Sequence, residues 1–240
     1  MLSSKRSKSI AAGVAAIAVA GGSYGIVSAT SGSSPAAAGS SSPPAGRSPG
    51  GPPAGGGGGS NARSGPAAGG AAGTVASVSA PGFTLTTAAG QKVTVTEASA
   101  TTYQNGTTPV SATAITAGEA VLVLGTTSGT TITATQVTVQ PAGSGPAATA
   151  AAKVIPFQRG APATARQAGQ VPASYTEGQG TIVSGTAANK ATEAALAAYP
   201  GGVVDRVVKL SNGEYEVHNI GVSWPHHVFV SQDFKVVGAD

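Results

Sequence analysis

A long stretch without any large apolar side chain decides how this chain can fold. Residues 30–72 consist almost wholly of Gly, Ala, Ser and Pro, and contain no Val, Leu, Ile, Met or aromatic residue. Such a segment buries too little apolar surface to offset the conformational entropy lost on ordering, so we predict a disordered linker. Residues 141–178 have a related composition, with Val154-Ile155-Pro156-Phe157 as their apolar cluster, and we predict a second linker there.

The two linkers confine the folded parts to residues 73–140 and 179–240, so we predict a multidomain protein with two small domains. Of the 240 residues, 36 are Gly and 16 are Pro, while 9% are charged and 4% aromatic. This composition argues against one large catalytic core.

The N-terminus has the features of an export signal. Basic residues precede an apolar run at residues 10–20, and Val27 and Ala29 supply small residues where a signal peptidase reads them. We predict that residues 1–29 are a signal, cleaved between Ala29 and Thr30. The alternative is an uncleaved membrane anchor, because residues 10–29 are about as long as a bilayer span. Both alternatives place the protein in the cell envelope or outside the cell.

The net charge of +4 does not indicate a nucleic-acid partner. The excess of Lys and Arg lies in the signal and the two linkers, whereas residues 73–140 and 179–240 each carry a small net negative charge. Neither folded segment has the clustered basic residues that phosphate binding requires. The chain has no cysteine, which excludes disulfides and thiolate metal sites.

Residues 73–140 have the pattern of a small all-β domain. Short runs of Val, Thr and Ile alternate with turn residues such as Pro81-Gly82 and Ser128-Gly129. In the last run the apolar parity shifts between Ala134 and Val137, which predicts a β-bulge. Five strands with a longer third connection match a Greek-key barrel of the oligonucleotide/oligosaccharide-binding (OB) type; the expected strands are residues 74–79, 83–87, 92–97, 119–125 and 131–139.

This segment also resembles the bacterial envelope family called domain of unknown function 5666. The resemblance rests on short motifs: Gly73-Thr74-Val75, Gly82-Phe83-Thr84-Leu85, Gly90-Gln91-Lys92-Val93-Thr94-Val95, Ala117-Gly118-Glu119-Ala120-Val121 and Thr133-Ala134-Thr135-Gln136-Val137. It implies an OB-like five-stranded barrel and says nothing of a ligand. Phe83 and Tyr103 are expected in the core, since a strand groove for nucleic acid would need more aromatic and basic residues.

Residues 179–240 predict a small α+β domain. Thr186 can cap a helix over residues 187–199, with Ala188, Ala191 and Ala195 on one face, and Pro200-Gly201-Gly202 ends it. Extended runs follow at residues 203–210, 214–219, 226–231 and 234–238. One helix on a small antiparallel sheet is the expected architecture.

The second segment resembles a PepSY domain, the module found in propeptides of secreted peptidases and in other envelope proteins. The residues that carry the resemblance are Tyr199-Pro200-Gly201, Val203-Val204 and Gly213-Glu214-Tyr215-Glu216-Val217-His218, after an Ala-rich helix. It implies a module that binds or regulates another protein, with an extracellular peptidase as the first candidate. It supplies no catalytic residue.

The residues that could perform chemistry do not converge in the sequence pattern. His218, His226 and His227 are the three histidines, but adjacent strand residues point to opposite faces, so we expect no metal site. No Gly-x-Ser-x-Gly elbow follows a strand and there is no thiol, which argues against a nucleophile. Glu214 and Glu216 are expected on a solvated strand face. We therefore predict a non-enzymatic protein without a cofactor or metal.

Trp224, His226 and His227 are the candidate partner-binding residues, because they lie where the PepSY-like pattern is interrupted. Trp224 is either a partly exposed anchor for a partner or a buried core residue. The sequence thus predicts an exported, non-enzymatic envelope protein whose second domain binds a protein. The alternative is a cell-wall glycan binder or an accessory of a wall hydrolase, with the barrel as the carbohydrate-binding part.

Overall fold

The computed structural model describes residues 65–141, 148–161 and 166–240, all within the compact unit Pro52–Asp240. The predicted signal and residues 30–64 of the predicted linker lie outside the described residues. The structure is mostly β, and a single helix in its described part is longer than one turn. This agrees with the predicted predominance of strands.

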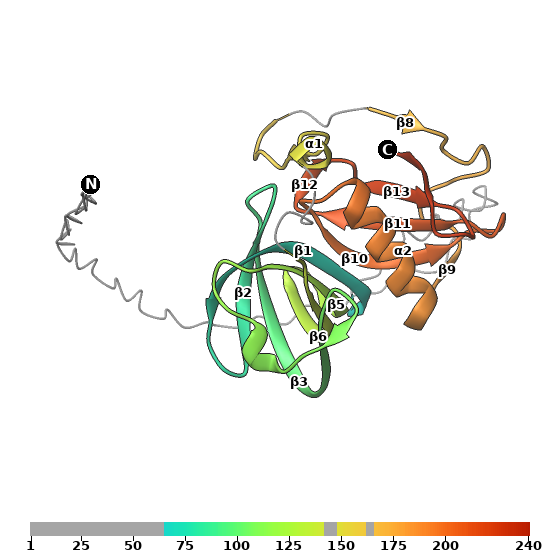
Figure 1. The fold of residues 1–240 in the computed structure, drawn as a ribbon. Coiled ribbons are helices and arrows are strands. Elements are labelled where there is room, and N and C mark those ends of the chain that lie inside the picture. The colour runs from blue at the N-terminus through green and yellow to red at the C-terminus, as the bar shows by residue number, and fades with distance from the viewer. Residues whose placement is uncertain (1–64, 142–147, 162–165) are drawn as a thin grey trace, which may run out of the picture. The chain divides into compact units, whose positions relative to one another are not determined.

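Five strands of the first segment close into a ring (Figure 1). Their order around the ring is β1-β2-β3-β6-β5-β1, and every neighbouring pair is antiparallel except the parallel pair β3–β6. The third connection holds β4 and the 3-10 helix η1. The bounds are β1 (Ala67–Val78), β2 (Gly82–Thr87), β3 (Lys92–Asn105), β4 (Thr108–Pro109), η1 (Ala112–Ala114), β5 (Ala120–Ser128) and β6 (Thr131–Val139).

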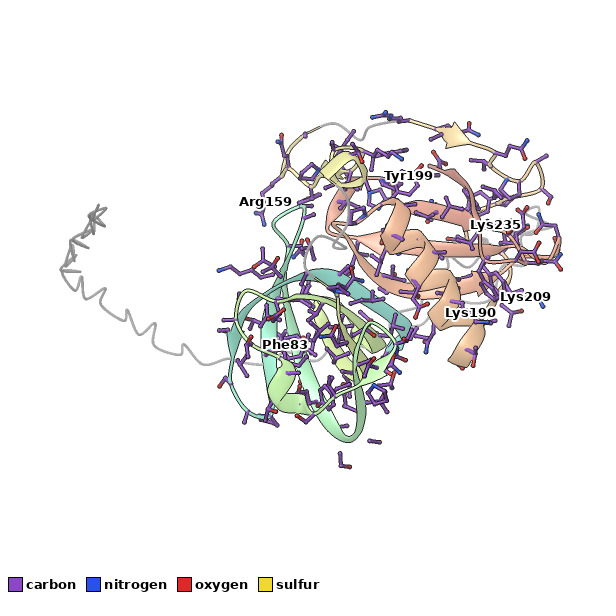
Figure 2. The ribbon with its side chains drawn as sticks, in the orientation of Figure 1. Phe83, Arg159, Lys190, Tyr199, Lys209 and Lys235 are labelled. Atoms are coloured by element: carbon purple, nitrogen blue, oxygen red, sulfur yellow. The ribbon has the colours of Figure 1, made fainter. Side chains whose placement is uncertain are left out.

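Alternating apolar residues form the inside of the ring, as the pattern predicts. Phe83 is 3% exposed and lies within the ring in Figure 2. The predicted bulge in the last strand is confirmed, because Leu124 pairs with Gln136 while its neighbour Gly125 pairs with Ala134.

Strand β1 begins at Ala67, inside the predicted linker. On one side, residues 67–74 of β1 pair with β5. On the other side, Gly70 and Ala71 pair with β10, and residues 73–78 pair with β2. A Cβ on Gly69 would stand 1.9 Å from the Val204 carbonyl oxygen, and one on Gly70 would stand 2.2 Å from that of Val123. The small residues that suggest a linker are therefore those that let β1 lie close to two neighbouring strands.

The second segment is an antiparallel sheet with a helix on one face. The sheet order is β10-β11-β13-β14, with β9 on the outer edge of β10 and β8 on that of β14. Figure 1 shows α2 lying across β10, β11 and β13. The bounds are β8 (Ala168–Gly169), β9 (Thr181–Ile182), α2 (Gly185–Ala198), β10 (Val203–Lys209), β11 (Tyr215–Ile220), β13 (His227–Val230) and β14 (Val236–Ala239).

Helix α2 confirms the predicted helix, but it begins two residues earlier than predicted. Ser184, not Thr186, is the N-cap residue, and the helix begins at Gly185. The predicted inner face is confirmed, since Ala188, Ala191 and Ala195 are each 0% exposed. Small side chains on this face let the helix backbone approach the sheet closely.

Residues 141–178, predicted as a linker, also contain structured parts. Strand β7 (Ile155–Pro156) pairs with β12 (Val222–Trp224), and the one-turn helix α1 (Ala148–Ala151) precedes β7. Val154 is buried in the same core as α2, while Phe157 remains 63% exposed. Part of the apolar cluster therefore fixes this segment to the second sheet. The prediction of a linker is wrong for these residues, because their contacts are with residues that are distant in sequence.

Candidate functional site

The three histidines lie on the face of the second sheet that is opposite α2. In β11, Tyr215 and Val217 belong to the core beneath the helix, so the alternating residues Glu216 and His218 point to the other face. His227 is directly opposite His218 on the neighbouring strand β13. The antiparallel register thus brings two histidines together on that face.

His226 completes the cluster, which corrects the expectation that the three rings stay apart. The ring centroids of His218 and His227 are 5.2 Å apart. The ring centroid of His226 lies 6.3 Å from that of His218 and 6.5 Å from that of His227. The alternation rule does not apply, because His226 lies in a bend before β13 begins. Its Nδ1 lies 3.2 Å from the Asn219 carbonyl oxygen.

Asp205 links this cluster to a buried arginine. Its Oδ1 is 2.6 Å from His218 Nδ1, and its Oδ2 accepts a hydrogen bond from Arg206 Nη1 at 3.3 Å. A bulge in β10 between Val204 and Arg206 lets these adjacent side chains meet. An acceptor on Nδ1 orients the His218 ring and leaves its Nε2 for other contacts.

The histidine face is partly covered, so the expectation of a solvated strand face is wrong for Glu216, which is 0% exposed. Val171 and Tyr175 from the segment before β9, and Ile182 of β9 itself, pack against the apolar half of this face. The Glu216 carboxylate lies 3.5 Å from His227 Nε2. Burial raises the pKa of the Tyr175 hydroxyl, and the nearby Glu216 carboxylate adds to the rise.

His227 is held in its neutral form by this environment. Burial is the main cause that lowers its pKa, and the neighbouring imidazoles of His218 and His226 and the guanidinium of Arg206 act in the same direction. The Asp205 carboxylate opposes them, and the net pKa is about 4. At neutral pH the imidazole of His227 therefore acts as a hydrogen-bonding group without charge.

Trp224 is 2% exposed, which confirms the core alternative and contradicts the partly exposed anchor. Its Nε1 donates to the Arg166 carbonyl oxygen at 2.6 Å, and the Arg166 guanidinium lies 4.7 Å from the ring centroid. Tyr199 meets the indole edge-on at 5.4 Å. Arg166 and β7, which pairs with the Trp224 strand, belong to the predicted linker, so part of this burial comes from a segment that is distant in sequence.

The histidines line a small open pocket of about 310 Å³. Its other lining residues are Glu177, Ser223, Trp224 and Asp240. His226 is exposed at its rim, whereas His218 and His227 are partly buried. The lining offers imidazole nitrogens together with two carboxylates, which suits hydrogen bonding to one inserted side chain. In the part of the chain that the structure describes, no group of three His, Cys, Asp or Glu is arranged to hold a metal ion.

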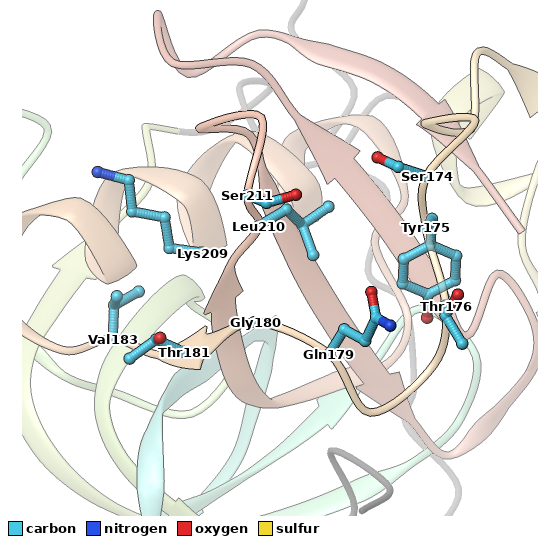
Figure 3. Close-up of a pocket in the computed structure, with 10 residues that line it drawn as sticks. All are labelled: Ser174, Tyr175, Thr176, Gln179, Gly180, Thr181, Val183, Lys209, Leu210 and Ser211. Atoms are coloured by element: carbon cyan, nitrogen blue, oxygen red, sulfur yellow. The ribbon is translucent and has the colours of Figure 1, made fainter. Parts of the chain in front are cut away.

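A larger hollow of about 630 Å³ lies beside β9 and the end of β10 (Figure 3). Polar groups such as Ser174, Thr176 and Gln179 line it, together with Leu210. Lys209 is the one charged side chain of its lining, and Figure 3 shows it extending away from Tyr175 and Gln179. No set of groups for acid–base or nucleophilic chemistry converges among these residues.

No family model, curated protein or solved structure matches this chain. The helices in the described ranges are all too short or too polar to cross a membrane. Ala29 and Thr30, the predicted cleavage site, lie outside the described residues.

Proposed function

We propose that the ring is an OB-type barrel and that the second segment is a PepSY-type module. The strand order supports the first assignment, because β1 pairs with both β2 and β5 while β3 and β6 form the one parallel pair of the ring. The order of helix and antiparallel strands supports the second. These assignments concern the fold alone.

The function we propose is that of an exported, non-enzymatic envelope protein whose second module binds a protein partner, with an extracellular peptidase as the first candidate. The histidine pocket is the observation that carries this proposal. It is an open depression lined by residues of β11, β12 and β13, and its volume of about 310 Å³ suits one partner side chain. Exposed His226 and buried Trp224 give its lining a polar and an apolar part.

A catalytic role fits this pocket less well. His227 is neutral and shares its carboxylate neighbour with Tyr175, and no hydroxyl nucleophile lies in hydrogen-bond contact with a histidine among the described residues. A general base without a positioned nucleophile contributes little. The same groups can recognise a partner through hydrogen bonds.

The test uses the full chain in two assays. Secreted peptidases are assayed with and without the protein, and peptidoglycan is incubated with the protein alone. We expect altered peptidase activity and no release of soluble glycan fragments. His226→Asp, which adds a negative charge between Glu177 and Asp240, should abolish the effect on the peptidase. Asn105→Asp, the same charge change at an exposed site on β3, should leave it intact.

Glycan release without added enzyme would overturn the proposal and favour the wall-hydrolase alternative. If the protein and both variants sediment tightly with peptidoglycan, the result would favour the alternative of a glycan-binding protein, with the ring as the binding part.

A further inference from the structure

A third cavity lies where the ring meets the second module. Its volume is about 680 Å³, a size typical of small-molecule sites. The start of β1, the end of β5 and the start of α2 all contribute to its lining. Apolar groups come from Pro66, Ala68 and Val183, and polar groups from Thr126 and Asn189. This cavity is separate from the histidine pocket, which none of these residues line.

Arg206 also lines this cavity, and part of its guanidinium has no partner. Its side chain is 4% exposed, and Nη1 donates to Asp205. Among the described residues, neither Nε nor Nη2 has a hydrogen-bond partner. A buried guanidinium nitrogen without a partner is costly. Nε and Nη2 together form the side-on edge of the guanidinium, which binds both oxygens of a carboxylate at once.

The start of α2 adds a second positive feature to the same cavity. Ser184 and Gly185 line it, and the Ser184 side chain makes no capping hydrogen bond. The first turn of the helix contains no acidic residue. The first backbone N–H groups of α2 and the positive end of its dipole therefore favour an anion here.

We propose that this cavity binds a carboxylate attached to a small apolar group, through the Nε and Nη2 edge of Arg206. A planar group with two oxygens matches this edge, which stays open because Asp205 pairs with Nη1 alone. The apolar body of the ligand lies against Pro66, Ala68 and Val183. The cavity and the histidine pocket share no lining residue, but Asp205 joins Arg206 to His218. Asn189, which lines the cavity alone, therefore provides the variant that tests this site without the other.

The test measures binding to the full chain by NMR, following the Arg206 Nε–H signal and the amide signals of Thr126 and Gly185. The probes are butyrate and N-acetyl-dialanine, each compared with its neutral amide, and inorganic phosphate. Both acids should shift these signals, and the amides should not. Tighter binding of N-acetyl-dialanine than of butyrate would identify the carboxyl end of a peptide as the natural ligand, and the reverse order would identify a free carboxylic acid. Equal shifts from acid and amide, or tighter binding of phosphate, would overturn the proposal.

Two variants complete the test. Arg206→Lys keeps the charge but lacks the two-nitrogen edge, and we expect it to weaken acid binding about tenfold or more. Asn189→Asp places a negative charge in the lining on a partly exposed helix residue and should weaken binding similarly, even if Arg206→Lys does not fold. Asn105→Asp, outside the cavity, should bind as the parent chain does. Unchanged affinity in Asn189→Asp would contradict the assigned site.

Discussion

His227 should make the protein less stable as the pH falls below about 6.5. Burial and the nearby positive groups lower its pKa from 6.5 to about 4 in the folded chain. The unfolded chain therefore binds a proton at a pH where the folded chain does not, and each such proton favours unfolding. The stability linked to His227 is complete above pH 6.5 and is lost as the pH falls towards 4.

The size of this effect follows from the two pKa values. One pKa unit corresponds to about 1.4 kcal/mol, so a shift from 6.5 to about 4 corresponds to about 3 kcal/mol over the whole range. Between pH 7 and pH 5, where few carboxylates titrate, the expected loss is about 2 kcal/mol. That is a large part of the stability of a small protein.

The assay is urea unfolding at a series of pH values from 7 to 5, with the free energy of unfolding extrapolated to water at each pH. His227→Gln keeps a polar side chain without the titration and should remove most of this pH dependence. His226→Gln is the control, because burial is the main cause of the His227 shift and replacing the exposed His226 should leave most of the dependence in place. If His227→Gln loses stability with falling pH as steeply as the parent chain, the assigned burial of His227 is wrong.

Three further predictions concern other parts of the molecule. Trp224→Ala should lower the free energy of unfolding by about 3 kcal/mol or more, because it empties a buried site, and a smaller loss by chemical denaturation would contradict that burial. Gly69→Ala should lower the free energy of unfolding by at least about 2 kcal/mol, since its Cβ would overlap the Val204 carbonyl. Hydrogen exchange should show weaker protection in both β5 and β10, because β1 pairs with both. An effect confined to one of these strands would refute the shared strand. The exported protein should begin at Thr30 on N-terminal sequencing, and an intact Met1 on membrane-bound protein would refute cleavage.

The sequence predicts the parts of the fold that depend on local patterns. Val93 and Val95 alternate with threonines in β3, and both are buried inside the ring. The parity shift after Ala134 correctly locates the bulge, because a change of face must accompany it. The helix face with Ala188 and Ala191 is likewise visible as a helical period.

Other features depend on contacts between distant residues and could not be predicted in this way. Gly69 and Gly70 belong to a strand because two other strands lie close to it, and nothing in their local sequence indicates this. Trp224 is buried by residues 155–156 and by Arg166, in a segment whose composition suggests a linker. The histidine cluster forms because a bend at His226 interrupts the strand alternation. The edge of Arg206 that has no partner among the described residues depends on the side chains packed around it, which no local pattern in the sequence indicates.

Site-specific crosslinking tests the central claim, that the histidine pocket of an exported protein binds a protein partner, most directly. A photoreactive amino acid replaces His226 in the full chain, or Asn105 in a matched control, and the protein is irradiated in its native envelope. We expect one predominant protein adduct from position 226, reduced in competition with unlabelled parent chain, and no such adduct from position 105. Equal adducts from both positions, or glycan adducts alone from position 226, would contradict the claim.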